Sequence, residues 1–200
     1  MRCDGLFLAG LAHCLPSPVD VAEAVADGRY APSDLAADEY ASITVATDQA
    51  PPEMAVAAAR SALRRAGLPP SEVALLLHAS AWFQGIDYWP AASYVHREVL
   101  GDAGRYAPAL DVQQMCAGAL GAVELAASYL AADPSRVSAL VTTADRFDGP
   151  GFDRWRADLP GLVYGDGAAA VVLGRAGFAR LLSVSTVVDT ALEGLYRGDE

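Results

Sequence analysis

Segments typical of buried β-strands alternate with segments typical of helices along this 200-residue chain. Continuous apolar runs without a polar face are expected for strands that are covered on both sides. Val73–Leu77 is such a run, and the other strand-like segments are Leu6–Leu11, Ala107–Val112, Val137–Thr142, Val163–Leu173 and Ala179–Val188. The helix-like segments between them are Val19–Ala26, Ala50–Ala66, Tyr88–Leu100 and Ala117–Ala131. This alternation predicts an α/β fold, with helices covering a mixed, mainly parallel sheet.

The helix signal is clearest in Ala50–Ala66. Pro51 and Pro52 suit the first turn of a helix, where their missing N–H groups cost nothing, and Gly67 suits its end. Alanines and a leucine recur at helical spacing and give the segment an apolar face. The pattern predicts one long amphipathic helix.

Charge and composition exclude several classes of function. A net charge of −11 argues against sequence-independent nucleic-acid binding, which needs a basic surface. All basic residues are arginine, so Schiff-base chemistry and a P-loop, which both need lysine, are excluded. The three cysteines, Cys3, Cys14 and Cys116, have neither metal-ligand spacing nor an even number. We expect a soluble protein of the reducing cytoplasm without a metal or membrane span, in which Leu6–Ala12 is a first strand rather than a signal peptide.

Cys116 lies where a strand-like stretch turns sharply into a long apolar helix. A thiol at a helix N-terminus feels the positive end of the helix dipole and unpaired backbone N–H groups, which favour its thiolate. A cysteine becomes a nucleophile near neutral pH in this way. The alternative is a small buried cysteine that packs as an inert hydrophobic residue. The turn alone leaves both interpretations open.

Two further motifs favour structural roles. Gly165–Ala170 matches the glycine fingerprint of dinucleotide-binding proteins, but it opens a strand-like run rather than a helix. Its glycines are better explained by a tight loop that passes close to another backbone. His78 ends a predicted strand and could serve a nucleophile, but a satisfied core histidine is the more common outcome.

Aromatic and basic residues gather in two connections. Trp82 and Phe83 belong to an aromatic stretch that could wall an acyl pocket, fill the core or form an oligomer contact. The longest irregular connection, Arg146–Pro160, contains Phe147, Arg154 and Arg156, and such loops often contact substrates. An arginine cluster on an acidic chain could bind a phosphate or an acidic carrier protein, although scattered surface arginines are ordinary.

Three segments in order resemble the N-terminal half of a β-ketoacyl-acyl-carrier-protein synthase III, in the thiolase superfamily. They are the turn from Asp111 to Gly118, the strand Val137–Thr143 and the glycine-aspartate-glycine loop with its strand, Tyr164–Leu173. Ser33–Tyr40 and Ala55–Leu68 also look like early segments of that family. The resemblance implies a thiolase-like fold, whose two similar halves form a five-layered α-β-α-β-α domain that dimerises. Residues 1–175 would form the N-terminal half-domain, and residues 176–200 its final strand and the start of the C-terminal half.

The resemblance implies acyl transfer through Cys116. The thiolate would attack an acyl thioester of coenzyme A or acyl carrier protein, and a second substrate would take the acyl group, without any cofactor. Expected contacts of the substrate are Trp82, Phe83, Met115, Phe147, Arg154 and Arg156. In the family the nucleophile works with a histidine and usually an asparagine of the C-terminal half. This chain has no asparagine and ends at Glu200, so a complementary half is expected to complete the site.

Two departures bear on the reaction. The stretch Ala41–Gln49 contains no arginine where housekeeping members have an arginine-rich segment, and Gln113–Met115 is bulkier and more polar than usual before the nucleophile. Both resemble specialised-metabolism relatives that acylate a hydroxyl or prime a polyketide. We therefore expect an acyltransferase acting on a natural product or carrier protein. The alternatives are a decarboxylative condensing enzyme that primes a fatty acid or polyketide, and a non-catalytic scaffold subunit of the same fold.

Overall fold

The computed structural model describes residues 1–34, 40–149, 152–156 and 162–195. Their main sheet has six strands in the order β5-β4-β6-β7-β1-β8. β5, β4 and β6 run parallel, whereas the pairs β6–β7, β7–β1 and β1–β8 are antiparallel. The α/β class with a mixed sheet is thus confirmed. The strands are β1 (Phe7–Cys14), β4 (Val73–Ala79), β5 (Ala109–Val112), β6 (Ser138–Asp145), β7 (Gly167–Gly174) and β8 (Ala179–Arg180).

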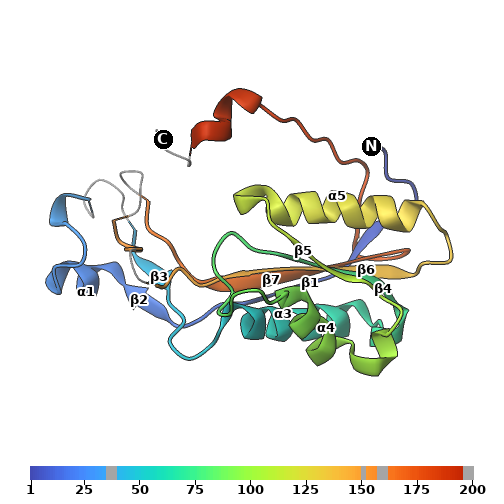
Figure 1. The fold of residues 1–200 in the computed structure, drawn as a ribbon, viewed down its shortest axis with the longest axis horizontal. Coiled ribbons are helices and arrows are strands. Elements are labelled where there is room, and N and C mark those ends of the chain that lie inside the picture. Colours follow the sequence, from blue (N-terminus) through green and yellow to red (C-terminus); the bar gives the residue numbers. More distant parts are fainter. Residues whose placement is uncertain (35–39, 150–151, 157–161, 196–200) are drawn as a thin grey trace.

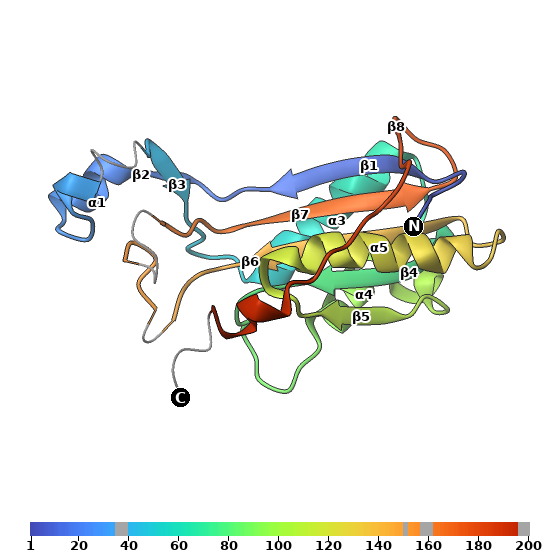
Figure 2. The same ribbon diagram turned by 90° about the horizontal axis from the view of Figure 1, so that it is seen from above.

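Helices cover both faces of this sheet (Figure 1). α3 (Pro51–Ala66) and α4 (Ala91–Val99) lie on one face, and α5 (Gly118–Ala131) lies on the other. Two apolar cores result, one between the sheet and the pair α3 and α4, the other between the sheet and α5. The view from above shows that α5 runs along the strands and begins at the sheet end where β4 and β5 finish (Figure 2). Short 3-10 helices are η1 (Pro70–Glu72), η2 (Gly101–Gly104), η3 (Met115–Ala117) and η4 (Thr190–Leu195).

The prediction of a long helix is confirmed in α3, including its ends. Both prolines occupy its first turn, and Glu53 accepts a hydrogen bond from the Ala50 N–H at 2.8 Å. Gly67 ends the helix with φ of 66°, a left-handed conformation that glycine adopts without strain. On β1, a Cβ at Gly10 would lie 2.2 Å from the Ala62 carbonyl oxygen, so only glycine allows α3 to pack this closely. Sequence therefore fixes both the length of α3 and its distance from the sheet.

A small subassembly extends beyond the end of the main sheet (Figure 1). It contains α1 (Val21–Ala26) and the antiparallel pair of β2 (Pro18–Asp20) and β3 (Ser42–Thr44). The predicted helix Val19–Ala26 is therefore shorter by two residues, because Asp20 caps it by accepting the Ala22 N–H at 2.8 Å. Tyr30 and Trp155 close a separate apolar cluster with Val21. Part of the irregular connection thus packs against the N-terminal region.

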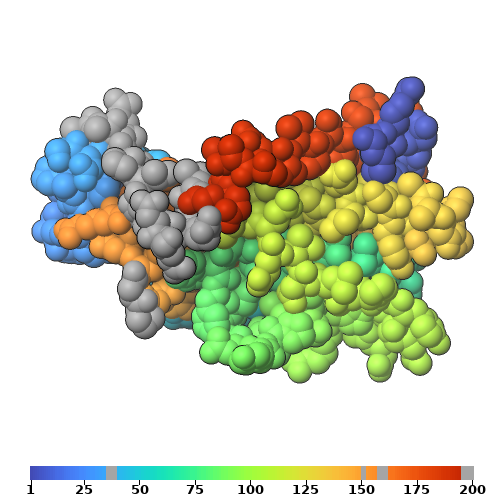
Figure 3. Space-filling model, turned by 45° about the horizontal axis from the view of Figure 1, so that its top comes forward, coloured from blue at the N-terminus to red at the C-terminus, as the bar shows by residue number. Residues whose placement is uncertain are grey.

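The prediction of a strand over Ala179–Val188 is wrong beyond its first two residues. β8 pairs with β1 only at Ala179 and Arg180. The chain then leaves the sheet and runs over α5 (Figures 1 and 3), where the Thr186 hydroxyl donates a hydrogen bond to Glu124. Leu181 and Val184 pack against the core on the α5 side, whereas Leu182, Val187 and Val188 are exposed.

Candidate functional site

The turn that contains Cys116 joins β5 to α5 at the carboxyl end of the parallel strands. β5 ends at Val112, and Met115, Cys116 and Ala117 form a 3-10 turn directly before α5. Gly118, the first residue of α5, is buried, and a Cβ there would lie 3.3 Å from the Ala79 Cβ. The missing side chain brings the start of α5 close to the end of β4. The sequence prediction of a sharp turn between a strand and a helix is confirmed.

The backbone of this turn is strained and its side chains are exposed. Met115 has φ of +47°, a conformation that residues with a Cβ adopt at a cost. The side chains of Met115 and Cys116 are both exposed. By contrast, Cys3 is buried and Cys14 is half-buried. Strain at a non-glycine residue beside an exposed thiol is typical of functional turns.

No side chain in the described part of the chain caps the start of α5. The N-cap residue, Ala117, makes no side-chain cap, and the first turn of α5 contains no acidic residue. The first N–H groups of any helix lack intrahelical partners and carry the positive end of its dipole. The Cys116 thiol therefore lies next to a helix end that favours a negative charge.

A cavity of about 650 Å³ opens beside the turn. The β4–α4 connection forms one wall and includes Trp82, Phe83 and Trp89; the β5–α5 turn forms the other, through Gln113 and Met115. Phe83 is 53% exposed, so its ring is not part of the core. The structure thus brings Met115, Trp82 and Phe83 together around one open cavity. Cys116 is not among the lining residues, but it follows Met115 directly in the chain.

His78 is a buried core histidine that positions this cavity wall. Its side chain is completely buried, with Nε2 3.1 Å from Gln84 Oε1 and Nδ1 2.9 Å from Thr142 Oγ1. The amide nitrogen of Gln84 donates to the carbonyl oxygens of Trp82 and Ala144, so its Oε1 is left to accept the proton on His78 Nε2. Burial lowers the pKa of His78 and keeps the ring neutral. Both ring nitrogens are engaged, so His78 has no free nitrogen for Cys116.

Asp145 holds the start of the same β4–α4 connection. This residue ends β6, and its carboxylate accepts the backbone N–H of Trp82 at 2.7 Å and that of Ala81 at 2.9 Å. Burial raises the pKa of Asp145 to about 6, the two N–H groups oppose this rise, and the Asp166 carboxylate adds to it. Asp145 and Gln84 therefore hold the first residues of the cavity wall from two directions.

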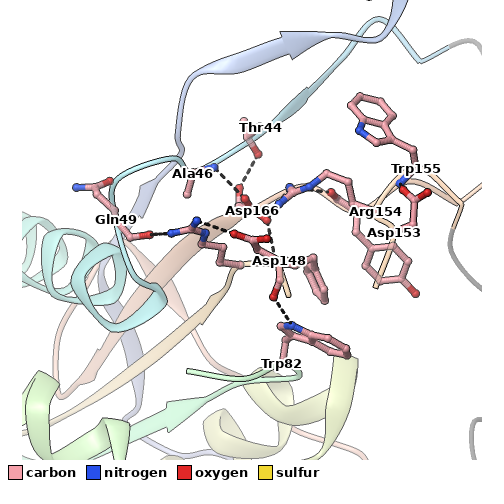
Figure 4. A network of polar contacts seen from close by, with 12 residues as sticks. Thr44, Ala46, Gln49, Trp82, Asp148, Asp153, Arg154, Trp155 and Asp166 are labelled. Atoms are coloured by element: carbon pink, nitrogen blue, oxygen red, sulfur yellow. Dashed lines mark hydrogen bonds and ion pairs between the residues drawn. The ribbon is translucent and has the colours of Figure 1, made fainter. Parts of the chain in front are cut away.

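Asp166, within the glycine-aspartate-glycine loop, connects three segments that are distant in sequence (Figure 4). Its buried carboxylate accepts N–H groups of Ala46 and Phe147, both at 2.8 Å. It also forms an ion pair of 2.9 Å with Arg154. A Cβ at Gly165 would lie 3.3 Å from Thr44 Oγ1, and β7 follows as a strand. The close backbone approach expected for this loop is thus confirmed, and the strand excludes a dinucleotide fingerprint.

Four aromatic rings pack together behind the cavity. Trp82 stacks on Phe152 at 4.6 Å between ring centroids, and Phe147 lies 4.7 Å from Tyr164. The Trp82 indole N–H also donates to the Asp148 carbonyl oxygen at 3.2 Å (Figure 4). Trp82 therefore lines the cavity and belongs to this cluster, whereas Phe147 lies within the cluster. Trp82 thus both packs among other aromatic rings and lines the cavity, which were two of its three possible roles.

The arginines of the irregular connection are engaged in different contacts. Arg154 is half-buried and paired with Asp166. Arg146 lies 2.6 Å from Asp148, and its buried Nε has no hydrogen-bond partner among the described residues. Arg156 is exposed and donates to the Gly28 carbonyl oxygen at 3.2 Å. The three guanidinium groups thus serve separate contacts, and Arg156 is the most accessible to a ligand.

Sequence reasoning missed Asp145, Asp166 and Gln84. An aspartate between two glycines in an apolar stretch signals a buried carboxylate, so Asp166 could have been found as a buried polar residue. Its partners lie 12 to 120 positions away, which a single sequence does not reveal. No cluster of His, Cys, Asp or Glu suited to a metal ion occurs among the described residues. In the same part of the chain, no helix is long and apolar enough to cross a membrane.

Comparisons with known proteins agree with this architecture. Residues 110–190 match the family model of 3-oxoacyl-[acyl-carrier-protein (ACP)] synthase III. The β-ketoacyl-[acyl-carrier-protein] synthase III of Neisseria meningitidis serogroup C is 34% identical over 62% of this chain and 37% of its own length. That of Rhizobium meliloti is 36% identical over 58% of this chain and 34% of its own length. The aligned part therefore spans little more than a third of these relatives.

Solved structures extend the similarity to nearly the whole chain. ChlB3, described as an acyltransferase, has a TM-score of 0.90 and 41% identity, over 97% of this chain and 57% of that one. The 3-oxoacyl-[acyl-carrier-protein] synthase III of Aquifex aeolicus has a TM-score of 0.71 at 24% identity, over 86% of this chain and 54% of that one. The fold is thiolase-like. The chain is related to the β-ketoacyl-acyl-carrier-protein synthase III family, whose members transfer or condense acyl groups.

Proposed function

We propose that this chain carries the nucleophile of an acyltransferase and that Cys116 becomes acylated. The observation that carries the proposal is the exposed thiol in a strained turn before α5, beside an open cavity of about 650 Å³. The family match begins at residue 110, so it includes this turn. An inert structural cysteine needs neither the exposure nor the strain.

The chemistry is nucleophilic acyl substitution. The Cys116 thiolate attacks the carbonyl carbon of an acyl thioester of coenzyme A or acyl carrier protein, and a new carbon–sulfur bond forms. The old carbon–sulfur bond breaks, and the leaving thiolate takes up a proton. A second substrate then attacks the acyl-enzyme and releases Cys116, so ping-pong kinetics are expected. Cys116 lies directly before the N-terminus of α5, where the N-cap residue Ala117 makes no side-chain hydrogen bond.

The predicted substrate contacts have different parts in this proposal. Met115, Phe83 and Trp82 line the cavity and are suited to contact the acyl group. Phe147 supports Trp82 from behind, with 6.2 Å between their ring centroids. Arg156 is exposed and suits a phosphate of coenzyme A or of a carrier-bound prosthetic group. Arg154 holds Asp166 and thereby the connection that carries Arg156.

We also propose that residues 1–175 form the N-terminal half of the thiolase-like domain and that residues 176–200 lead into a C-terminal half. Apolar side chains on β1 and α5 support a partner surface, since Leu11 is 51% and Leu120 74% exposed. An apolar hollow of about 170 Å³ lies between these residues. A second half would cover this surface and supply the histidine, and dimerisation would complete the family architecture.

Transfer to a hydroxyl is our preferred second step. Similarity to ChlB3 over 97% of the chain supports acyl transfer rather than condensation, because that protein is described as an acyltransferase, and the hydroxyl as acceptor is our own proposal. Decarboxylative condensation with a malonyl extender is the second candidate, favoured by curated relatives that are β-ketoacyl-acyl-carrier-protein synthases. Release of labelled carbon dioxide from malonyl thioester occurs in condensation and not in ester formation, which separates the two.

Intact-mass measurement after incubation with acyl-CoA tests the proposal. The protein is purified under native conditions, so that any chain completing the fold is retained. We expect the mass of one acyl group on the wild type and on Cys14→Ala, and none on Cys116→Ala. Normal assembly without any adduct would refute the proposal and leave a scaffold subunit as the explanation.

A further inference from the structure

The cavity lined by Met115, the residue directly before Cys116 in the chain, is rich in hydrogen-bond acceptors. Its wall includes the carboxylates of Asp87 and Asp111 and the side-chain amides of Gln113 and Gln114. Among the described residues that line it, none is arginine or histidine. An alkyl chain would leave these polar groups without a ligand partner. The lining is therefore unusual for a pocket that receives only hydrocarbon.

Asp87 and Gln113 are available to a ligand. Neither side chain makes a hydrogen bond or ion pair with another described residue, and both are exposed. Asp111 has one oxygen engaged, because its Oδ1 accepts the Ala92 N–H at 3.0 Å at the start of α4. Thus the Asp87 carboxylate, one carboxylate oxygen of Asp111 and the Gln113 amide are available to a ligand in the same cavity.

The rest of the wall is held rigidly. His78, Gln84 and Asp145 fix residues 81–84 by the contacts described above. Trp89 at the other end of the connection packs on Tyr94 with 5.6 Å between ring centroids. A ligand therefore meets a wall that is held at residues 81–84 and at Trp89, with the exposed Asp87 between them.

Resting on the proposed function, we infer that the acyl group carried by Cys116 is neutral and bears hydrogen-bond donors such as hydroxyls. Asp87 then excludes acyl groups that bear a free carboxylate. A hydroxyl donates to the Asp87 carboxylate or to the Gln113 amide oxygen. A ligand carboxylate in the same place meets like charge without any cation on the described wall to offset it. The apolar faces of Trp82 and Phe83 hold the carbon skeleton of the acyl group.

Three coenzyme A thioesters of equal chain length test this inference: pentanoyl, 5-hydroxypentanoyl and glutaryl. The rate of acyl adduct formation on Cys116 is measured by mass spectrometry on the natively purified protein. We expect the hydroxylated group to react fastest and the glutaryl group at least about tenfold slower. Asp87→Asn should reduce the gap between these two groups severalfold. Asp4→Asn, which removes an exposed carboxylate outside the cavity lining, should not change it.

The outcomes separate the inference from the proposed function. Equal rates for hydroxypentanoyl and glutaryl groups, or a gap that Asp87→Asn leaves unchanged, would overturn the inference while Cys116 remains the acylated residue. A faster pentanoyl group than hydroxypentanoyl group would overturn the donor requirement. Absence of an adduct with all three thioesters would overturn the proposed function together with the inference.

Discussion

The loop around Asp166 and the turn around Cys116 both lie at the end of the sheet where the parallel strands β4, β5 and β6 finish, but they are built in opposite ways. Asp166 is 2% exposed, and its carboxylate has a backbone or guanidinium partner on each oxygen. Cys116 is exposed, follows a residue with positive φ and precedes a helix without a side-chain cap. The Asp166 carboxylate is satisfied by internal hydrogen bonds and an ion pair, whereas the Cys116 side chain is exposed.

The difference separates the scaffold from the reactive part. The Asp166 carboxylate links the residues after β3 and the β6–β7 connection to the start of β7. Asp145 connects β6 to the β4–α4 connection that forms the cavity wall. The Cys116 turn rests on that support and adds little to it. Substitutions in the first region should therefore affect folding, and those in the second should affect chemistry.

Asp166→Ala should give the largest effect on stability. It leaves Arg154 without its partner and the Ala46 and Phe147 N–H groups without an acceptor, so we expect a loss on the order of 3–5 kcal/mol. Cys116→Ala, the matched change in the exposed turn, should alter stability by less than about 0.5 kcal/mol. Urea unfolding measures both. Similar losses at the two positions would contradict the contrast.

Trp82→Ala should combine both kinds of effect. It removes the ring that packs on Phe152 and the hydrogen bond to Asp148, so we expect a loss of roughly 2 kcal/mol in stability. It also removes part of the cavity wall, and the KM for the acyl donor should rise. Trp82→Phe keeps the ring contact and should recover most of the stability. Full stability with a raised KM would show that Trp82 serves the cavity alone.

Asp145→Asn should change how stability depends on pH. The folded pKa of about 6 is above the ordinary aspartate pKa of 3.8, so the folded state binds more protons between these values. The cost of ionised Asp145 is fully present above pH 6 and is relieved as the pH falls towards 4. The unfolding free energy of the wild type, relative to Asp145→Asn, should therefore be higher at pH 4.5 than at pH 7.5. Thermal unfolding at both pH values measures it, and a constant difference would rule out this linkage.

Met115→Gly should have the smallest effect. Glycine accepts a positive φ without strain, so we expect stability to rise by up to about 1 kcal/mol. Met115→Ala keeps the Cβ and the strain and serves as its control. Chemical denaturation compares the two. If both variants have wild-type stability, the turn stores no measurable strain.

Local signals explain which elements the sequence predicted well. The two prolines and Gly67 marked both ends of α3, because capping depends on neighbouring residues alone. The helix predicted over Tyr88–Leu100 instead begins at Ala91, and the strand over Ala179–Val188 is reduced to two residues. An apolar run does not by itself reveal which element covers it, and Leu182, Val187 and Val188 in the second of these segments are exposed.

The candidate site was predicted only in part for a similar reason. The strand, turn and helix around Cys116 are continuous in sequence, so the turn could be found directly. The contacts of Asp145 and Asp166 join residues that are 12 to 120 positions apart and depend on the packed fold. Phe147 packs on Tyr164 and Arg154 pairs with Asp166, contacts that the irregular loop does not reveal in sequence, and their contact with substrate stays a prediction.

Pre-steady-state release of coenzyme A tests the central claim most directly. The natively purified protein is mixed with an excess of acyl-CoA, free coenzyme A is followed in time, and the acylated residue is located by peptide mass spectrometry. We predict a burst of about one coenzyme A per chain, with the acyl group on Cys116 and none on Cys3 or Cys14. A burst with the acyl group on another residue, or no burst and no adduct on Cys116, would contradict the account.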